Sequence, residues 1–307
     1  MTDFVVTYVD GNDPEWRKGY MCTCIRQRRP QGIAPERYRD WGTLKYIIRS
    51  VEKYMPWIRN VYLVVERESQ VPDWVNKETV NVVYHTDIMP DDVLPVYNST
   101  AIEMYLYNIP GMAERFIYAN DDMIAMNYLT EDDFYDATGY PKLFVTKKPW
   151  KPTHMYSCHL HNGEALVRGL LGMAPDDENT TRTGHNMNPM LRSTWEMLWE
   201  ERGKRIRQSV TSFRAKHNIN QELCSYWHIL SGNFSKSERR THYVEMRDMK
   251  TVANVIRETE AQLLCVNDAG CLNFENDKKI LLRSLLKKFP GRSKYELKRH
   301  DHTDCAL

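Results

Sequence analysis

Short runs of β-branched and aromatic residues alternate with helical patterns through the first half of the chain. Four of these runs are apolar on both faces, which is typical of strands buried in a parallel sheet. They are Phe4–Val9, Val61–Val65, Val80–Tyr84 and Phe116–Tyr118. Strands that alternate with helices predict an α/β fold, whose mainly parallel sheet carries helices on both faces.

Two helices are expected between these strands. Apolar residues recur at helical spacing from Leu44 to Val51, and Ser99 can cap a second helix that runs through Tyr105. The second half reads as mainly helical, with few strands between the patterns Leu191–Trp199, Asn220–Leu230, Met249–Leu264 and Lys278–Lys288. We therefore expect an α/β core over residues 1–150 and a mainly helical part over 151–307.

Charge and cysteine usage exclude several classes of protein. The 42 basic and 41 acidic side chains nearly cancel, and a net charge of +1 argues against a general nucleic-acid-binding surface. No segment reaches the roughly 20 apolar residues that span a bilayer, and the N-terminus does not read as a signal peptide. The 7 cysteines, odd in number and irregularly spaced, favour free thiols in a reducing compartment. These features predict a cytoplasmic protein.

The first candidate site follows the opening strand, in the segment Asp10-Gly11-Asn12-Asp13-Pro14. Ligands of open α/β sheets bind beyond the carboxyl ends of the strands. Gly11 permits a sharp turn there, and the carboxylates of Asp10 and Asp13 can hydrogen-bond a ribose or a base. The alternative is a plain turn, because these residue types are the commonest turn formers.

A second candidate is Asn120-Asp121-Asp122, at the end of another predicted strand. Two adjacent carboxylates repel each other unless a cation or hydrogen-bond donors compensate. A hard cation such as Mg²⁺ would do so and would bridge a diphosphate. The alternative is that these polar residues only end the strand.

Two helix starts offer anion sites, because free backbone N–H groups and the helix dipole favour phosphate there. Arg39 and Asp40 precede the first predicted helix, and Asn98 and Ser99 precede the second. Capping alone, or a surface ion pair for Arg39, would explain the same residues.

Five polar residues of the second half also stand out: His185, Arg192, Arg214, Asn267 and Asp268. Asn267 and Asp268 follow an apolar run, as the earlier acidic pair does. A lone histidine is more often structural than catalytic. The chain lacks the Gly-rich dinucleotide fingerprint, the phosphate loop and the Gly-x-Ser-x-Gly elbow. Their absence argues against a nicotinamide dehydrogenase, a P-loop kinase and an α/β-hydrolase.

Taken together, four blocks of the sequence resemble the stealth family of sugar-1-phosphate transferases, in the family's order. The first block is Phe4–Pro14. The second holds Arg37–Asp40, Arg49–Arg59, Leu94-Pro95, Asn98–Glu103, Ile109–Gly111 and Asn120–Met123. The third runs from His185 to Arg214, and the fourth contains Leu264–Asp268, Phe289-Pro290 and Ser293–Glu296.

The resemblance implies a glycosyltransferase-like core that binds a nucleotide-sugar, with Mg²⁺ or Mn²⁺ as cofactor. It implies that an acceptor hydroxyl attacks the β-phosphorus of a UDP-sugar, with UDP-GlcNAc as the default donor, and that UMP leaves. His185 and Arg214 match the family's catalytic His and Arg. Asp121 and Asp122 match its Asn-Asp-Asp motif, and the expected metal ligands are Asp122 and Asp268.

The remaining expectations also come from this resemblance. The helical second half would complete the active site, so that both halves form one catalytic domain. The partners would be a nucleotide-sugar and a saccharide acceptor of capsular or exopolysaccharide synthesis, with peripheral association with a membrane capsule-export complex. Which of His185, Asp121 and Asp122 is the base stays open. An ordinary metal-dependent glycosyltransferase that releases UDP, and a non-catalytic nucleotide-sugar or polysaccharide-binding protein, are the alternatives.

Overall fold

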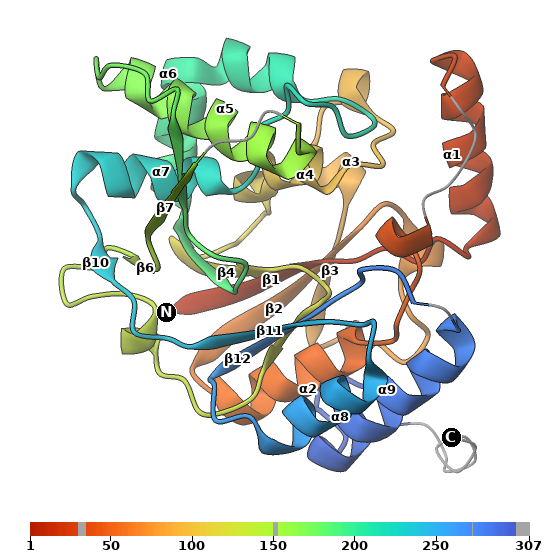
Figure 1. Cartoon of the computed structure of the whole chain (residues 1–307). Coiled ribbons are helices and arrows are strands. Elements are labelled where there is room, and N and C mark those ends of the chain that lie inside the picture. Colours follow the sequence, from red (N-terminus) through yellow and green to blue (C-terminus); the bar gives the residue numbers. More distant parts are fainter. Residues whose placement is uncertain (30–34, 150–152, 272, 299–307) are drawn as a thin grey trace.

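The central element is a five-stranded sheet with the order β3-β2-β1-β4-β9. We describe residues 1–29, 35–149, 153–271 and 273–298 of a computed structural model (Figure 1). The first four strands are parallel and the last is antiparallel to its neighbour. Their bounds are Thr2–Thr7 (β1), Ile58–Val65 (β2), Val80–Tyr84 (β3), Arg115–Ala119 (β4) and Asn188–Leu191 (β9). The predicted mainly parallel sheet is confirmed.

Helices cover both faces of this sheet, as predicted (Figure 1). The helices are Pro14–Arg26 (α1), Leu44–Tyr54 (α2), His85–Ile88 (α3), Ser99–Glu103 (α4), Met155–Leu170 (α5), Arg192–Ser209 (α6), Glu222–Ser231 (α7), Met249–Glu258 (α8) and Phe274–Lys288 (α9). Side chains alternate along a strand. Val6 of β1 therefore packs in one core with α2, α8 and α9, while Val5 packs in the other with α5, α6 and α7. Among the described residues, no helix combines the length and the apolar character that a membrane crossing requires.

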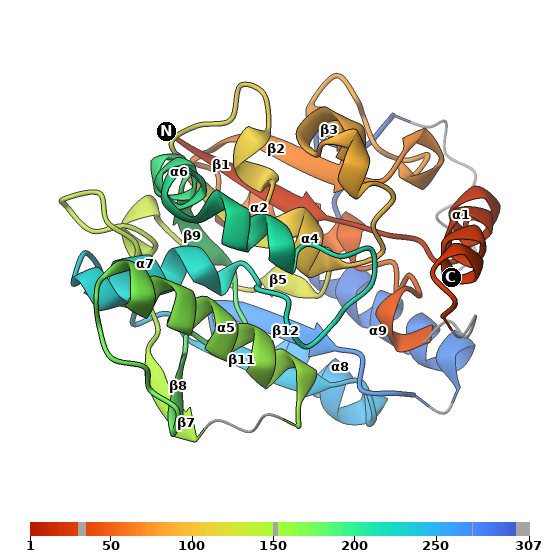
Figure 2. The same ribbon diagram turned by 90° about the horizontal axis from the view of Figure 1, so that it is seen from above.

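The second half contains more strands than expected. A three-stranded sheet with the order β11-β12-β5 lies beside α8 and α9 (Figure 2). Its strands are Met123–Ala125 (β5), Thr241–Glu245 (β11) and Leu263–Asn267 (β12). Two further sheets have two strands each. One pairs β7 (Thr146–Pro149) with β8 (Asn179–Arg182), and the other pairs β6 (Lys142–Leu143) with β10 (Ser235–Lys236). Strand β9, also from the second half, completes the main sheet. The two halves of the chain are therefore interleaved.

The expected helix Met249–Leu264 is wrong over residues 259–264. The helix ends at Glu258, and β12 begins at Leu263. Residues 263–266 are all buried, because β11 and β5 flank the strand on both edges. A short apolar run of this kind fits a buried strand as well as a helix, so periodicity alone does not separate the two.

The cap of the second predicted helix is also corrected. Asn98, not Ser99, is the N-cap, because its Oδ1 accepts from the backbone N–H of Thr100 at 3.2 Å. Ser99 is the first helical residue. The α-helix ends at Glu103 rather than running through Tyr105.

Candidate active site

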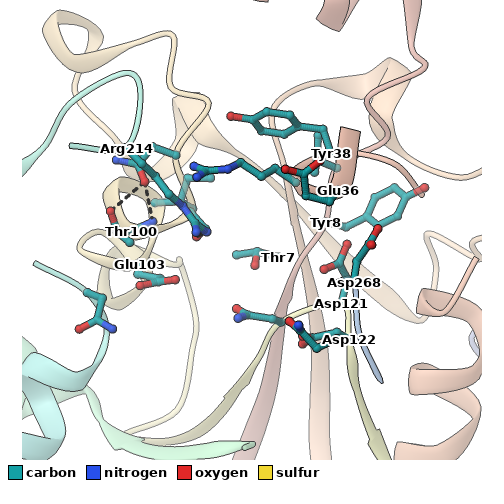
Figure 3. A pocket seen from close by; sticks show the side chains of 18 of the residues that line it. Thr7, Tyr8, Glu36, Tyr38, Thr100, Glu103, Asp121, Asp122, Arg214 and Asp268 are labelled. Carbon is teal, nitrogen blue, oxygen red and sulfur yellow. Dashed lines mark hydrogen bonds between the residues drawn. The ribbon is translucent and has the colours of Figure 1, made fainter. Parts of the chain in front are cut away.

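A cavity of about 670 Å³ opens beyond the carboxyl ends of β1, β4 and β12 (Figure 3). A volume of this size is typical of sites that enclose a small ligand. Most of the predicted site residues line it: Arg39, Asn98, Ser99, Asn120, Asp121, Asp122, His185, Arg214, Asn267 and Asp268. The fold therefore brings together residues from both halves of the chain, whereas Arg192 lies elsewhere, paired with Glu196 on α6.

Asp13 and Gly11 do not line the cavity, and each has a structural contact instead. Asp13 is the N-cap of α1, accepting at Oδ1 from the N–H groups of Glu15 and Trp16 at 2.7 and 3.2 Å. At Gly11, an added Cβ would lie 2.6 Å from the carbonyl oxygen of Tyr38. Gly11 thus allows the segment that carries Arg39 to approach the end of β1, and its backbone N–H donates to the same oxygen at 2.7 Å.

Asp10 and Asp40 also lie outside the cavity lining. Asp10 accepts from the backbone N–H of Asn12 at 2.8 Å, as expected for a turn residue. Asp40 accepts from the N–H of Gly42 at 2.7 Å, and the Nζ of Lys278 lies 3.4 Å from its Oδ2. Substrate contact by Asp10, Gly11, Asp13 or Asp40 stays a prediction.

The acidic pair after β4 is electrostatically asymmetric. Burial, together with the charges of Asp122 and Asp40, raises the pKa of Asp121 to about 7. Burial acts in the same direction on Asp122, but His185 outweighs it and lowers the pKa of Asp122 below its usual value. At neutral pH the cavity therefore holds one firmly ionised carboxylate beside one that is poised to exchange a proton.

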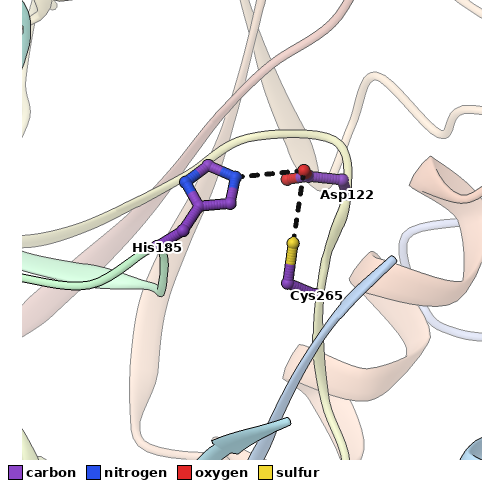
Figure 4. A group of neighbouring side chains, drawn as sticks. All are labelled: Asp122, His185 and Cys265. Atoms are coloured by element: carbon purple, nitrogen blue, oxygen red, sulfur yellow. Dashed lines mark hydrogen bonds and ion pairs between the residues drawn. The ribbon is translucent and has the colours of Figure 1, made fainter. Parts of the chain in front are cut away.

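Asp122 lies between two side chains from distant parts of the sequence (Figure 4). Its Oδ2 lies 3.1 Å from Nε2 of His185 and accepts from Sγ of Cys265 at 3.5 Å. Burial alone would lower the pKa of His185, yet Asp122, with smaller contributions from Glu222 and Glu103, raises it. His185 is therefore a stronger base than a free imidazole, held by a carboxylate that fixes its orientation.

The side chains of Asp122, His185 and Cys265 can together hold a cation. The three ligand atoms of Asp122, His185 and Cys265 lie within 4.8 Å of one another. The Oδ1 of Asp122 is buried and has no hydrogen-bond partner among the residues that the structure describes. Because an unpaired buried carboxylate oxygen is costly, this atom fits a metal ligand.

Asp268, the other expected metal ligand, is hydrogen-bonded to two side chains of the protein. Both of its oxygens accept from Arg39, at 2.5 Å from Nε and 2.6 Å from an Nη, and the indole N–H of Trp41 donates to Oδ2 at 2.8 Å. Burial would raise the pKa of Asp268, but these hydrogen bonds lower it. Asp268 thus ties β12 to the segment before α2, and its role as a metal ligand stays a prediction.

Arg214 lies on the opposite wall of the cavity from the acidic pair (Figure 3). An Nη of Arg214 donates to Oγ of Ser99 at 2.7 Å, and the guanidinium forms no ion pair with any described residue. It is therefore available to an anion of the ligand. Asn98, by contrast, is buried and uses its side chain within the protein, as the cap of α4 and as a donor to Thr211 and Asn218.

Two buried carboxyl groups near the cavity were not predicted as site residues. Glu103 accepts from the backbone N–H of Gln221 at 2.9 Å, and burial raises its pKa. Burial also raises the pKa of Glu222 to about 7, while Thr183 donates to it. Glu103 stands four residues after Ser99, on the same face of α4, and it ends the block Asn98–Glu103 that resembles the family. Nothing in the local sequence around Glu222 distinguishes it from a surface residue of a helix.

Known proteins match this chain over nearly its full length. The conserved region described as Stealth protein CR2 matches residues 37–143. The receptor polysaccharide phosphotransferase WefC of Streptococcus oralis is 30% identical, over 96% of this chain and 99% of WefC. The capsular polysaccharide phosphotransferase WcwK of Streptococcus pneumoniae is 29% identical, over 96% and 99%. The exopolysaccharide phosphotransferase cps2G of Lactiplantibacillus plantarum is 28% identical, over 96% of each chain.

Among solved structures, the galactosyltransferase LgtC in complex with donor and acceptor sugar analogs superposes with a TM-score of 0.42 at 10% identity, over 91% of this chain and 95% of LgtC. The sequence relatives define a class of enzymes, the polysaccharide phosphotransferases, which are sugar-phosphate transferases. The chain belongs to the stealth family of these enzymes, as its four sequence blocks predicted.

Proposed function

We propose that this enzyme transfers a hexose-1-phosphate, by default GlcNAc-1-phosphate, from a UDP-sugar to a saccharide hydroxyl. The acceptor oxygen forms a bond to the β-phosphorus, and the bond between that phosphorus and the bridging oxygen of the diphosphate breaks. UMP leaves with the bridging oxygen, and the hydroxyl proton passes to a base of the protein. The product is a phosphodiester. The observation that carries this proposal is the pairing of His185 with Asp122 in a cavity that Arg214 also lines.

His185 is the proposed base. When the N–H at Nε2 donates to Asp122, the lone pair of the neutral ring is at Nδ1, where it can accept the hydroxyl proton. Asp122 then stabilises the imidazolium that forms. Asp121, whose pKa of about 7 also lies near neutrality, is the second candidate for this role.

Arg214 is the proposed phosphate clamp. A guanidinium offers several N–H groups in a fork that matches phosphoryl oxygens, over which charge is spread in the transition state. Its contact with Ser99 fixes the side chain at the start of α4.

Asp122 would hold the divalent metal that the resemblance implies, through the oxygen that has no partner within the described residues. The metal would supply positive charge for the diphosphate and the leaving UMP. Carboxylate oxygen suits Mg²⁺ or Mn²⁺, whereas the imidazole and thiol beside it are softer donors. The hard oxygen of Asp122 is therefore the ligand that we assign.

We place the reaction in the synthesis of a capsular or exopolysaccharide, because the named relatives are polysaccharide phosphotransferases. Activated sugars are made in the cytoplasm, which is where we place the enzyme, with peripheral association with a capsule-export complex. The donor default of UDP-GlcNAc comes from the family resemblance alone.

The experiment that tests this function identifies the released nucleotide. The enzyme is incubated with Mg²⁺, a panel of nucleotide-sugars and capsule-type oligosaccharides, and the nucleotides are separated by chromatography. A nucleoside monophosphate together with a new phosphodiester supports the proposal and names the donor. Release of the diphosphate with a new glycosidic bond would instead indicate an ordinary glycosyltransferase.

A further inference from the structure

A group of cations lies beside the mouth of the cavity, and the proposed reaction does not use most of them. Arg26, Arg28 and Arg29 are exposed at the end of α1, and Arg37, Arg214 and Lys216 are exposed nearby. We call these six residues the basic rim. None of them forms an ion pair with a described residue, although such pairs are common elsewhere on this surface.

Side-chain contacts join the end of α1 to the segment that carries Arg214, so the cations on both belong to one surface. The guanidinium of Arg29 lies over the ring of Phe213, 5.2 Å from its centroid, directly before Arg214 in the chain. The amide of Gln27 donates to Oγ of Ser212 at 3.0 Å. The end of α1 is therefore packed against the segment that delivers Arg214 to the cavity.

Tyr38 connects the rim to the cavity. It lines the cavity, as do Arg37 and Arg214, and its hydroxyl donates to the carbonyl of Tyr97 at 2.7 Å. Burial raises the pKa of Tyr38 to about 12, and Arg214 and Arg37 are the cations that oppose this rise. The charges thus extend from the cavity to the end of α1, and the carboxylates of Glu36 and Glu103 also line the cavity near Arg37 and Arg214.

We infer that the basic rim binds an acceptor glycan that already contains phosphodiesters. This inference rests on the proposed function, in which every transfer leaves one negative charge in the product. A chain extended by several transfers would carry such charges at intervals behind its reactive end. Unpaired arginines recognise phosphate oxygens through paired N–H groups. The rim therefore favours the class of acceptor that the enzyme itself would produce.

An anionic membrane surface fits the rim less well. A helix that lies on a membrane exposes an apolar face between its charges. On α1 the apolar side chains of Trp16, Tyr20 and Cys24 are buried against the protein, and Ile25 is the large apolar residue that is exposed, at 61%. The exposed side of α1 is charged rather than amphipathic, which favours a hydrated polyanion as the partner.

The test compares binding of two probes to two charge-matched variants. The probes are a phosphodiester-linked capsular oligosaccharide of several repeats and the neutral repeat obtained by hydrolysing its phosphodiesters and then removing the remaining phosphate groups with a phosphatase. The rim variant is Arg26→Gln/Arg29→Gln, and the control is Arg283→Gln/Lys287→Gln, which removes two exposed cations from α9 that do not line the cavity. Thermal unfolding checks that both variants fold.

We expect wild type to bind the charged probe more tightly than the neutral one. The rim variant should weaken binding of the charged probe on the order of tenfold, from two exposed charge contacts, and leave the neutral probe unchanged. The control variant should resemble wild type. No preference for the charged probe, or an equal loss in both variants, would overturn the inference.

Two further measurements distinguish this inference from membrane binding and from the proposed function. If the rim variant loses binding to phosphatidylglycerol vesicles while binding of the charged glycan is unchanged, the rim is a membrane contact and the inference fails. Transfer to a neutral acceptor, assayed independently, reports on the proposed function. Normal transfer without any preference for the charged probe would contradict the basic-rim inference alone, whereas absent transfer would contradict the proposed function.

Discussion

The Nε2 atom of His185 lies 3.1 Å from Oδ2 of Asp122, although 63 residues separate the two in the sequence. One comes from the loop before β9 and the other from the end of β4, and these two strands are paired in the main sheet. Sheet register therefore sets the contact. Asp122 both orients the imidazole and raises its pKa, so we expect the two side chains to act as one unit.

Replacing Asp122 by Asn tests whether His185 depends on Asp122 for activity. Asp122→Asn keeps the size of the side chain but removes the charge, so kcat should fall by about 100-fold or more. Cys265→Ala is the matched control, because it removes the other, weaker contact of the same oxygen and should reduce kcat by less than about fivefold. Steady-state kinetics of both variants decide the matter. Similar rates for Asp122→Asn and wild type would contradict the assigned role.

Metal binding should depend on Asp122 more than on Asp268. We expect Asp122→Asn to raise the Kd for Mn²⁺ by about tenfold or more. Asp268→Asn should change it by less than about threefold, because Arg39 and Trp41 already occupy the oxygens of Asp268. Mn²⁺ titration followed by electron paramagnetic resonance measures both constants. An equal loss in the two variants would favour the pair of ligands expected from the family resemblance.

Arg214 should act mainly on the transition state. Arg214→Ala is expected to lower kcat/KM by about 100- to 1000-fold, as found when a donor to a developing charge is removed. Ser99→Ala removes only the hydroxyl that fixes the guanidinium, and a loss of about 3- to 10-fold should follow. If Arg214→Lys restored full activity, charge alone would suffice and the proposed fork geometry would be wrong.

The sequence predicted the position of the acidic residues better than it predicted their partners. Apolar runs identified β1, β2, β3 and β4. Among the polar residues that follow such runs, Asn120, Asp121, Asp122, Asn267 and Asp268 line the cavity, whereas Asp10, Gly11 and Asp13 do not. Asp268 was found in this way even though the end of the helix before it was misplaced. The contact of Asp268 with Arg39 spans 229 residues, and no local pattern encodes a pairing of that kind.

Two candidates for substrate contact also have a structural role. Asp13 and Asn98 both cap helices, since the residue types that bind polar ligands also satisfy free backbone N–H groups. Substrate contact by either residue stays a prediction. Strand β9 was missed because its four residues pair with one neighbour only and include a proline. Its placement decides where His185 lies, so the centre of the site could not be built from local patterns.

Acid stability should depend on His228, which is buried between α6 and α7. Its Nε2 lies 3.0 Å from Oγ1 of Thr194 and its Nδ1 lies 3.1 Å from the carbonyl oxygen of Asn233. Burial lowers its pKa to about 4. Below about pH 6.5 the unfolded chain therefore binds a proton that the folded chain does not, and stability falls as the pH falls toward 4.

The variant His228→Gln should remove this part of the pH dependence. The free energy of unfolding of wild type should decline relative to that of the variant by up to about 1.4 kcal/mol per pH unit between about pH 6 and 4.5. Urea titrations at several pH values give the two curves. Curves that run parallel across this range would show that His228 does not titrate as its surroundings imply.

The most direct test of the central claim follows the β-phosphorus of the donor. A UDP-sugar that carries a radioactive label at this atom is incubated with the enzyme, Mg²⁺ and a capsular oligosaccharide acceptor, and the products are separated. We expect the label to move to the acceptor with the sugar and the released nucleotide to be unlabelled UMP. A labelled UDP beside an unlabelled, elongated acceptor would contradict phosphoryl transfer by this enzyme.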